Sequence, residues 1–239
     1  NCFRKMARNA IYYYRKIDKF MPSLNQIEFI KGNRTKLKEP VLIIGCKEYD
    51  FDTHNFVDEL NKLGINDTIG IDIQGGPGVD VVLNICDSKN QFIMKYCNYF
   101  NSVICMQTLY SVENPFKAAE NIYLMMNKSS VLFFSDVFVH RIHRIPTDYW
   151  RFSYDAHKQL FKKLKFDDIK TKIGLTRQNV LLDMTYPFPE LSKYKKQHNE
   201  SSIEFIIRKL FRRIFFHSMI NLPRLFPEIS IFSISAKVD

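Results

Sequence analysis

The sequence predicts an α/β fold with a mostly parallel sheet and helices on both faces. Short apolar runs alternate along the chain with segments of helical spacing, a pattern typical of parallel strands joined by crossover helices. The chain has 239 residues, of which 46% are hydrophobic and 25% charged, as in an ordinary globular protein. We expect one such domain over residues 40–239, preceded by an N-terminal helical segment over residues 1–39.

Seven apolar runs predict buried strands. They are residues 41–44, 68–72, 79–85, 102–106, 131–135, 166–174 and 230–238. Four intervening segments have helical spacing. They are residues 56–63, 91–98, 115–126 and 155–165. Pro115 suits the first turn of its helix, where a backbone N–H group is not needed.

Two segments lie outside this alternation. Residues 4–20 predict an amphipathic helix, and residues 23–39 look irregular and polar. Residues 176–227 form a predicted helical insertion before the last strand, with a basic helix over residues 203–220. We expect that helix to cover the domain as a lid. The alternative is weak peripheral contact with an anionic membrane, because four phenylalanines alternate there with four cations.

Composition narrows the class of protein. The net charge of +10 implies attraction to anions. The five cysteines are odd in number and contain no C-x-x-C pair, so we expect neither a disulfide framework nor a metal site. No apolar run is long enough to span a membrane, and the first twenty residues do not read as a signal peptide. These features favour a cytoplasmic protein, with the inner membrane face as the alternative location.

Gly45 and Asp72 suggest a nucleotide site. Gly45 follows the first predicted strand, but a single glycine there is a weak signal. Asp72 closes the second strand, a position from which a carboxylate can accept hydrogen bonds from both hydroxyls of a ribose. The alternative is that Asp72 belongs only to a strand-end turn.

The segment His143–Ser153 is the densest group of chemically active residues. It follows the fifth predicted strand, where open α/β sheets bind ligands. The ordinary pKa of His143 suits a general base, and Asp148 would orient it or bind the acceptor. Arg151 would hold an anionic group through two hydrogen bonds. The alternative is an internal ion pair of Asp148 with Arg151, with Trp150 in the core.

Four further side chains are candidates on the acceptor side. Tyr149 and Trp150 would form walls of the acceptor pocket. Tyr110 and His140 are expected to bind the acceptor. Together with Asp136, they are close enough in sequence to be rivals of His143 and Asp148. Their relative roles depend on which side chains reach the pocket.

Three parts of the chain resemble a known family. Residues 71–87, 101–112 and 143–153 are similar to class I S-adenosylmethionine-dependent methyltransferases, in a bacterial branch that reads H-x-x-P-x-D-Y-W-R-F-[ST] after the fifth strand. The resemblance covers about residues 41–164. It implies a Rossmann-like, seven-stranded sheet with the last strand antiparallel, and S-adenosyl-L-methionine as the cofactor.

The resemblance also implies cofactor contacts. Gly45 would let the backbone approach the methionine group, Asp72 would hold the ribose and Ile73 would pack on the adenine. The other implied contacts are Cys46 after the first strand, Asp87 and Ser88 at the adenine edge, and Met106 and Gln107 after the fourth strand. The chain departs from the family at Lys47 and Tyr49, where the first motif has glycines.

We therefore expect a methyltransferase that acts on an oxygen of a small molecule. The resemblance favours a sugar, or a phosphorylated or phosphoramidate precursor, in bacterial capsule or surface-polysaccharide biosynthesis, and the net charge favours an anionic acceptor. One alternative is a nucleic-acid methyltransferase, but no N-P-P-Y or D-P-P-Y tetrapeptide follows the fourth strand. Another is a non-catalytic protein with the same fold. The oligomeric state stays open.

Overall fold

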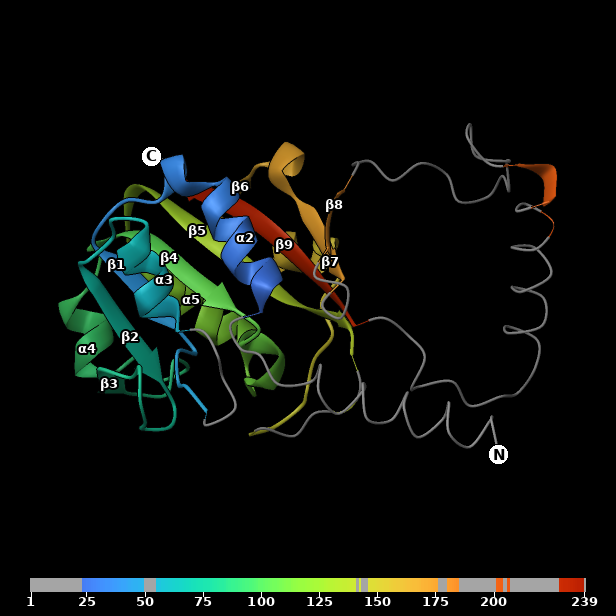
Figure 1. Ribbon diagram of the computed structural model, residues 1–239. Helices are drawn as coiled ribbons and strands as arrows, with labels where there is room; N and C mark the ends of the chain where they lie inside the picture. The colour runs from blue at the N-terminus through green and yellow to red at the C-terminus, as the bar shows by residue number, and fades with distance from the viewer. Residues whose placement is uncertain are drawn as a thin grey trace, which may run out of the picture. The chain divides into compact units, whose positions relative to one another are not determined.

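The computed structural model describes residues 23–49, 55–140, 142, 146–175, 180–184, 201–203, 206 and 228–238. Over these ranges the chain forms a nine-stranded sheet with helices on both faces (Figure 1). The chain divides into two compact units, residues 1–184 with 227–239 and residues 185–226, and the sheet belongs to the first. The α/β fold class is confirmed, with two more strands than predicted.

The strands are β1 (Val41–Ile44), β2 (Thr68–Asp72), β3 (Val81–Val82), β4 (Phe100–Met106), β5 (Met126–Val139), β6 (Leu164–Phe166), β7 (Lys172–Leu175), β8 (Val180–Asp183) and β9 (Ile229–Lys237). The α-helices are α2 (Leu24–Gly32), α3 (Phe56–Lys62), α4 (Gln91–Lys95), α5 (Pro115–Met125) and α6 (Tyr154–Leu160). Three short 3₁₀ turns are η1 (Arg34–Lys36), η2 (Leu109–Ser111) and η3 (Asp168–Lys170).

The sheet has the order β3-β2-β1-β4-β5-β9-β7-β8, and β6 also pairs with β9. The first five strands in this order are parallel to one another. The last strand, β9, runs antiparallel to β5, as the resemblance implied. Because β1, β2, β4 and β5 are parallel, their carboxyl ends meet at one edge of the sheet, where open α/β folds bind ligands.

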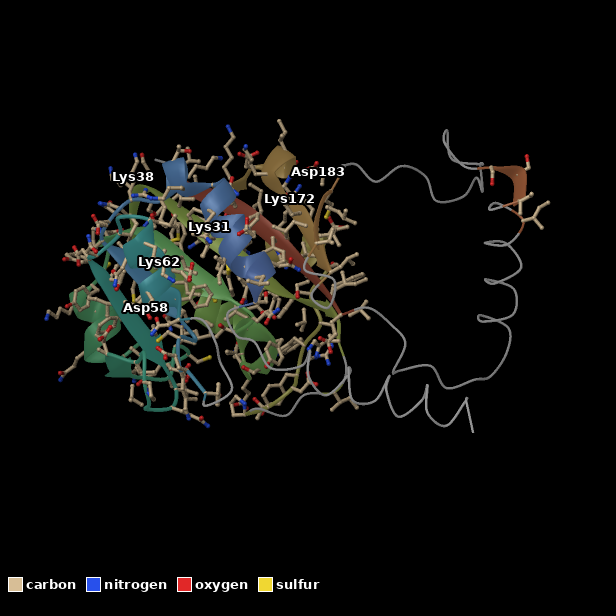
Figure 2. The ribbon with its side chains drawn as sticks, in the orientation of Figure 1. Lys31, Lys38, Asp58, Lys62, Lys172 and Asp183 are labelled. Atoms are coloured by element: carbon tan, nitrogen blue, oxygen red, sulfur yellow. The ribbon has the colours of Figure 1, made fainter. Side chains whose placement is uncertain are left out.

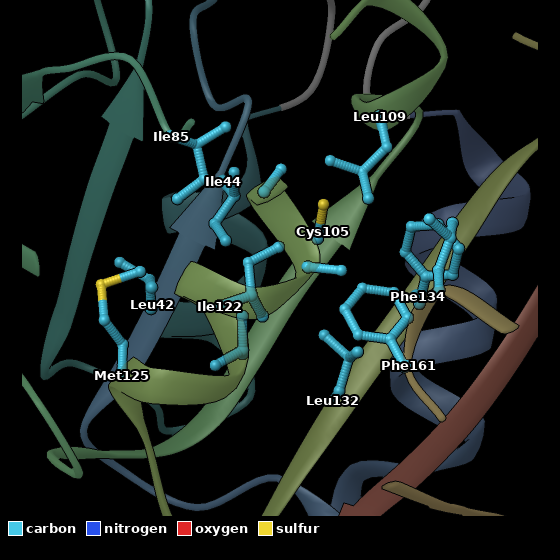
Figure 3. Packing of buried hydrophobic residues seen from close by; sticks show 14 of the residues in the cluster. Leu42, Ile44, Ile85, Cys105, Leu109, Ile122, Met125, Leu132, Phe134 and Phe161 are labelled. Carbon is cyan, nitrogen blue, oxygen red and sulfur yellow. The ribbon is translucent and has the colours of Figure 1, made fainter. Parts of the chain in front are cut away.

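The core has two layers, one on each face of the sheet. Along β1, Leu42 and Ile44 join the buried cluster with α4, α5 and α6, whereas Val41 and Ile43 join the cluster with α2 and α3. This alternation follows from the two-residue period of a strand. Figure 3 shows the first cluster, in which the aliphatic side chains of α5 pack on β1, β4 and β5. Burial on both faces explains why these strands read as continuous apolar runs.

The prediction that residues 23–39 are irregular is wrong, because α2 lies there. A capping box starts this helix: the Ser23 backbone N–H donates to Gln26 Oε1 at 2.6 Å, and the Gln26 N–H donates to Ser23 Oγ at 3.4 Å. Phe29 then packs against Phe133 and Phe232, with ring centres 6.5 and 5.1 Å apart. The helix is therefore part of the core of the first unit.

Three predicted strand boundaries also differ. The run 166–174 is broken by η3, where the Asp167 side chain caps the turn, so it forms parts of two strands. The run 79–85 pairs with β2 only at β3. Part of the predicted helical insertion is instead β8, which forms a hairpin with β7 that the Lys172–Asp183 ion pair joins (Figure 2).

The predicted helix over residues 4–20 lies outside the described residues, as does nearly all of the predicted basic helix over residues 203–220. Of the helices that the structure does describe, none combines the length and the apolar character needed to cross a membrane. Within the same residues no three His, Cys, Asp or Glu side chains are grouped as metal ligands.

Candidate active site

Gly45 forms the turn at the end of β1. Its φ angle of +74° is in the left-handed region, and its N–H donates to the Ile71 carbonyl at 2.9 Å. A Cβ at this position would lie 2.2 Å from Thr108 Oγ1. Thr108 is itself held by hydrogen bonds of its hydroxyl to the carbonyls of Ile44 and Met106, both at 3.1 Å. Only glycine therefore fits this turn, and Thr108 is a site residue that the sequence did not single out.

Asp72 ends β2 with its carboxylate held by backbone groups. The Lys47 N–H donates to Asp72 Oδ2 at 3.2 Å, and the Gln74 N–H donates to Oδ1 at 2.9 Å. A carboxylate oxygen can accept about two hydrogen bonds, so each oxygen of Asp72 can accept one more beside the bond described here. Beside it, the Ile73 side chain is 57% exposed. The geometry provides an oriented acceptor group next to an open apolar side chain.

The loops after β1 and β2 are joined directly. The Glu48 N–H donates to the Pro77 carbonyl at 3.0 Å. At Gly78, whose φ angle is +79°, a Cβ would lie 2.8 Å from the Cys46 carbonyl oxygen. The Asp80 carboxylate accepts a hydrogen bond from the Gly70 N–H at 2.7 Å, which joins the end of the loop after β2 to β2 itself. These contacts set the position of Asp72 relative to Gly45.

The remaining predicted cofactor residues differ in accessibility. Cys46 and Met106 are buried, so they can offer a ligand little beyond backbone atoms. Burial, with a smaller contribution from Asp72, raises the pKa of the Cys46 thiol to about 12. Gln107 has a φ angle of +51°, and its Nε2 donates to Ser230 Oγ at 3.2 Å. Asp87 is exposed and Ser88 partly exposed, in the turn after β3.

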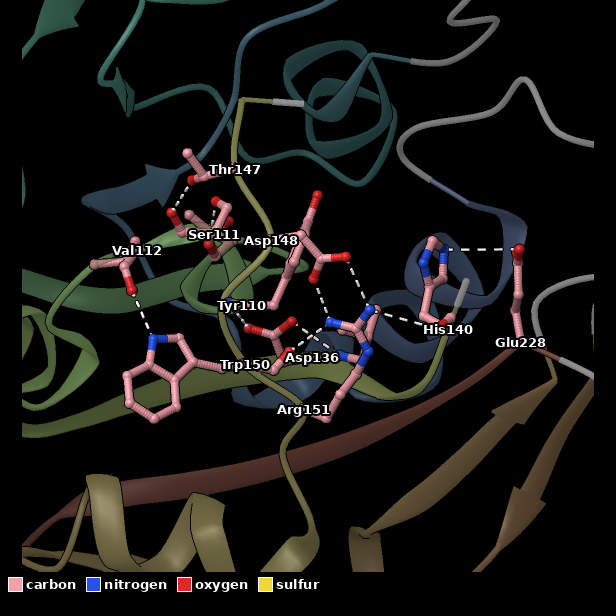
Figure 4. A network of polar contacts seen from close by, with 12 residues as sticks. Tyr110, Ser111, Val112, Asp136, His140, Thr147, Asp148, Trp150, Arg151 and Glu228 are labelled. Carbon is pink, nitrogen blue, oxygen red and sulfur yellow. Dashed lines mark hydrogen bonds and ion pairs between the residues drawn. The ribbon is translucent and has the colours of Figure 1, made fainter. Parts of the chain in front are cut away.

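The segment from Pro146 to Phe152 is fastened to the turn after β4 (Figure 4). The N–H groups of Tyr149 and Trp150 both donate to the Tyr110 carbonyl, at 2.9 and 3.0 Å. The indole Nε1 of Trp150 donates to the Val112 carbonyl at 2.8 Å, although 37% of this side chain stays exposed. The expectation that Trp150 lies in the core is thus wrong, because its ring lies at the surface with its N–H turned inward.

Arg151 forms a two-pronged ion pair with Asp148. One guanidinium nitrogen donates to Asp148 Oδ2 at 2.9 Å, and the other contacts Oδ1. The same group also donates to the carbonyls of Trp150, at 2.8 Å, and His140, at 3.4 Å. The Asp148 side chain is only 5% exposed. Of the two interpretations of this pair, the structure shows the internal ion pair.

Asp136 lies beneath this pair and is fully buried. Its carboxylate accepts the Tyr110 N–H at 2.9 Å and the Val137 N–H at 2.8 Å. Burial raises the pKa of Asp136 to about 7, while these N–H groups and the Arg151 charge act in the opposite direction. Burial also raises the pKa of the Tyr110 hydroxyl, and the charges of Asp136 and Asp148 add to that rise.

His140 and Tyr149 are the remaining predicted acceptor residues, and the structure describes both. His140 Nε2 lies 3.7 Å from Glu228 Oε1, and Glu228 is 8% exposed. The Tyr149 side chain is more than half exposed. His143 lies outside the described residues, so its predicted role as the base stays a prediction. The structure thus brings Tyr110, Asp148 and Arg151 into one polar network (Figure 4).

Comparisons with known proteins identify the fold. Neither a protein-family model nor a curated protein matches the sequence. Among solved structures, an S-adenosylmethionine-dependent methyltransferase from Archaeoglobus fulgidus is 19% identical, with a TM-score of 0.52 and coverage of 88% of this chain and 92% of the other. The phosphoethanolamine N-methyltransferase 2 of Haemonchus contortus is 12% identical, with a TM-score of 0.54 and coverage of 97% and 58%.

A third solved structure, a putative sarcosine dimethylglycine methyltransferase from Galdieria sulphuraria, is 9% identical to this chain. Its TM-score is 0.51, and the match covers 89% of this chain and 85% of the other. At such low identity the likeness concerns architecture rather than substrate. The strand order and the antiparallel last strand agree with that likeness. The chain has the class I fold of S-adenosylmethionine-dependent methyltransferases.

Proposed function

We propose that this chain is an S-adenosylmethionine-dependent methyltransferase. The observation that carries the proposal is the Asp72 carboxylate, held at the end of β2 by two backbone N–H groups. In this fold a carboxylate in that position accepts hydrogen bonds from the ribose hydroxyls of a nucleoside. Gly45 leaves the end of β1 free of a side chain, and the exposed Ile73 offers a face for the adenine. These residues fit the adenosyl group.

The same proposal assigns the other predicted cofactor residues. Asp87 and Ser88 lie at the adenine edge, and Gln107 lies beyond β4 at the methionine end. Cys46 and Met106 would contribute backbone atoms only, because their side chains are buried. When bound, the cofactor supplies a methyl group that its positive sulfur has already activated. The protein then has to position the acceptor and remove its proton.

We propose a hydroxyl group of a small molecule as the acceptor, with a sugar as the first candidate. Tyr149 and Trp150 present partly exposed rings at the acceptor edge, and such rings combine an apolar face with a polar tip. Arg151 is already engaged by Asp148, so it no longer supports recognition of an anion by a free guanidinium. A phosphate or phosphoramidate on the acceptor would instead be attracted by the net charge of +10.

In this proposal His143 accepts the proton of the acceptor hydroxyl, since its ordinary pKa is near neutrality. Asp148 fixes the shape of the acceptor segment through Arg151 rather than accepting that proton. A place in bacterial capsule or surface-polysaccharide biosynthesis rests on the motif from His143 to Ser153 alone. Loss of methyl transfer in His143→Ala, with a retained fold, would agree with this role.

Isothermal titration calorimetry with S-adenosylmethionine and S-adenosylhomocysteine tests the proposal. We expect both to bind the wild type and Asp72→Ala to weaken binding at least tenfold, since a charged acceptor of two hydrogen bonds is lost. Asp155→Ala is the matched control, because Asp155 is an exposed carboxylate on α6. Absence of binding to the wild type, or equal binding to Asp72→Ala, would contradict the proposal.

A further inference from the structure

Lys47 and Gln74 join the loops after β1 and β2 through their side chains. The Lys47 Nζ donates to Gln74 Oε1 at 2.8 Å. The same two residues donate their backbone N–H groups to the two oxygens of Asp72. The backbone and side-chain contacts therefore close a ring of hydrogen bonds around one side of the Asp72 carboxylate.

The Lys47 side chain lies along the second loop and does not extend freely into solvent. A Cβ on Gly76 would lie 3.1 Å from Lys47 Cε and 3.3 Å from its Cγ, so the lysine stem occupies the space that the glycine leaves open. The Lys47 ammonium also lies 5.1 Å from the centre of the Tyr49 ring. Three partners thus hold this lysine in one conformation: Gln74, Gly76 and Tyr49.

We propose that the Lys47–Gln74 bridge is a latch that closes the ribose side of the cofactor site and sets its affinity. This inference rests on the proposed function, because it takes Asp72 as the residue that holds the ribose. The latch connects the two residues that donate to the Asp72 oxygens, and in this proposal a nucleoside that binds the carboxylate has to open it. The apparent affinity is then reduced by the fraction of molecules in which the latch is open.

The strength of one hydrogen bond sets the size of the effect. A partly exposed bond between an ammonium and an amide oxygen favours the closed state by a modest factor, about fivefold. Lys47→Met keeps the stem but removes the donor, and Gln74→Leu keeps the volume but removes the acceptor. We expect each to bind more tightly by about that factor. Gln74→Glu converts the bridge into an ion pair, and we expect weaker binding by a similar factor.

Isothermal titration calorimetry with S-adenosylhomocysteine measures these changes. This probe carries no charge on its sulfur, so its affinity reports the latch rather than repulsion from the lysine. In the Lys47→Met background Gln74→Glu should no longer weaken binding, because its partner is missing. Lys95→Met is the matched control: Lys95 also places its ammonium over a tyrosine ring, 5.0 Å from the centre of Tyr96, but on α4. We expect its affinity to equal that of the wild type.

Hydrogen exchange in the ligand-free protein gives a second readout. The Lys47 and Gln74 amides donate to Asp72, and we expect them to exchange about fivefold faster in Lys47→Met and Gln74→Leu than in the wild type. If the wild type binds and both variants bind equally or more weakly, the latch is wrong while the proposed function stands. Unchanged exchange would also overturn the latch. If neither the wild type nor any variant binds, the proposed function fails and the latch fails with it, and faster exchange then shows only that the bridge restrains the two loops.

Discussion

The carboxylates of Asp72 and Asp148 both accept hydrogen bonds at the same edge of the sheet, but the donors differ. Asp72 accepts backbone N–H groups from Lys47 and Gln74, which orient the carboxylate and leave its charge in place. Asp148 is paired with the Arg151 guanidinium, which neutralises the charge and uses both oxygens. The first arrangement leaves a carboxylate able to receive hydroxyl groups, and the second fixes the shape of a loop.

In sequence these two aspartates look equivalent, because each follows a strand at the ligand-binding edge. The two aspartates differ in their hydrogen-bond partners, and these partners lie at different distances along the chain. Arg151 is three residues from Asp148, whereas Lys47 reaches Asp72 from the loop of another strand. An arginine three residues from an aspartate can thus form an internal ion pair with it, as Arg151 does with Asp148.

The largest expected effect comes from Gly45→Ala in the turn after β1. The new Cβ would lie 2.2 Å from Thr108 Oγ1, and a φ angle of +74° strains any residue with a side chain. We expect a loss of about 3 kcal/mol in the free energy of unfolding, measured with urea. Gly32→Ala is the control, since no atom lies within 4 Å of its Cβ position. Equal stability of the two variants would disprove the close approach of Thr108.

A somewhat smaller effect is expected from Arg151→Met in the segment after β5. This change leaves Asp148 without its charged partner in a position where its side chain is 5% exposed, and we expect a loss of about 2 kcal/mol. Urea unfolding measures it, and Asp148→Leu in the same protein should restore part of the loss. Binding of S-adenosylhomocysteine should stay within about twofold of the wild type. A large loss of binding with full stability would place Arg151 in a ligand site instead.

A dependence of stability on pH is the smallest expected effect when it is counted for each pH unit. Burial lowers the pKa of His157 to about 3, so between about pH 6.5 and pH 3 the unfolded chain binds a proton that the folded chain does not. His157 therefore destabilises the protein by about 1.4 kcal/mol for each unit that the pH falls. Asp136, with its pKa raised to about 7, has the opposite slope between about pH 4 and pH 7.

Urea unfolding at pH 5, 6 and 7 separates these two groups. Relative to the wild type, His157→Gln should gain about 1.4 kcal/mol for each unit of decreasing pH, and Asp136→Asn should gain with increasing pH. Such a result would show that Asp136 is a buried carboxyl with a raised pKa. Parallel pH profiles for the wild type and Asp136→Asn would contradict the raised pKa.

The parts of the fold that local pattern controls could be predicted. Strands β1 and β4 are buried almost throughout, so each reads as an apolar run, and α5 is marked by Pro115. Helix α2 was missed although Ser23 and Gln26 carry the capping-box pattern and Leu24, Ile27 and Ile30 have helical spacing. Strand β8 could not be predicted, since four residues become a strand only through pairing with β7.

The candidate site divides in the same way. Gly45 and Asp72 could be predicted from their places at strand ends. Thr108 could not, because its importance depends on a contact across two strands that only the folded chain brings together. The ion pair of Arg151 with Asp148 was one of two interpretations of the sequence. Spacing alone does not show whether an arginine contacts its neighbour or a ligand.

A crystal structure with S-adenosylhomocysteine tests the central claim most directly, that Asp72 holds the cofactor and Asp148 holds the loop. We expect both ribose hydroxyls on the Asp72 carboxylate, an opened Lys47–Gln74 bridge and an intact pair of Asp148 with Arg151. A ribose bound away from Asp72, or a ligand group inserted between Asp148 and Arg151, would contradict it.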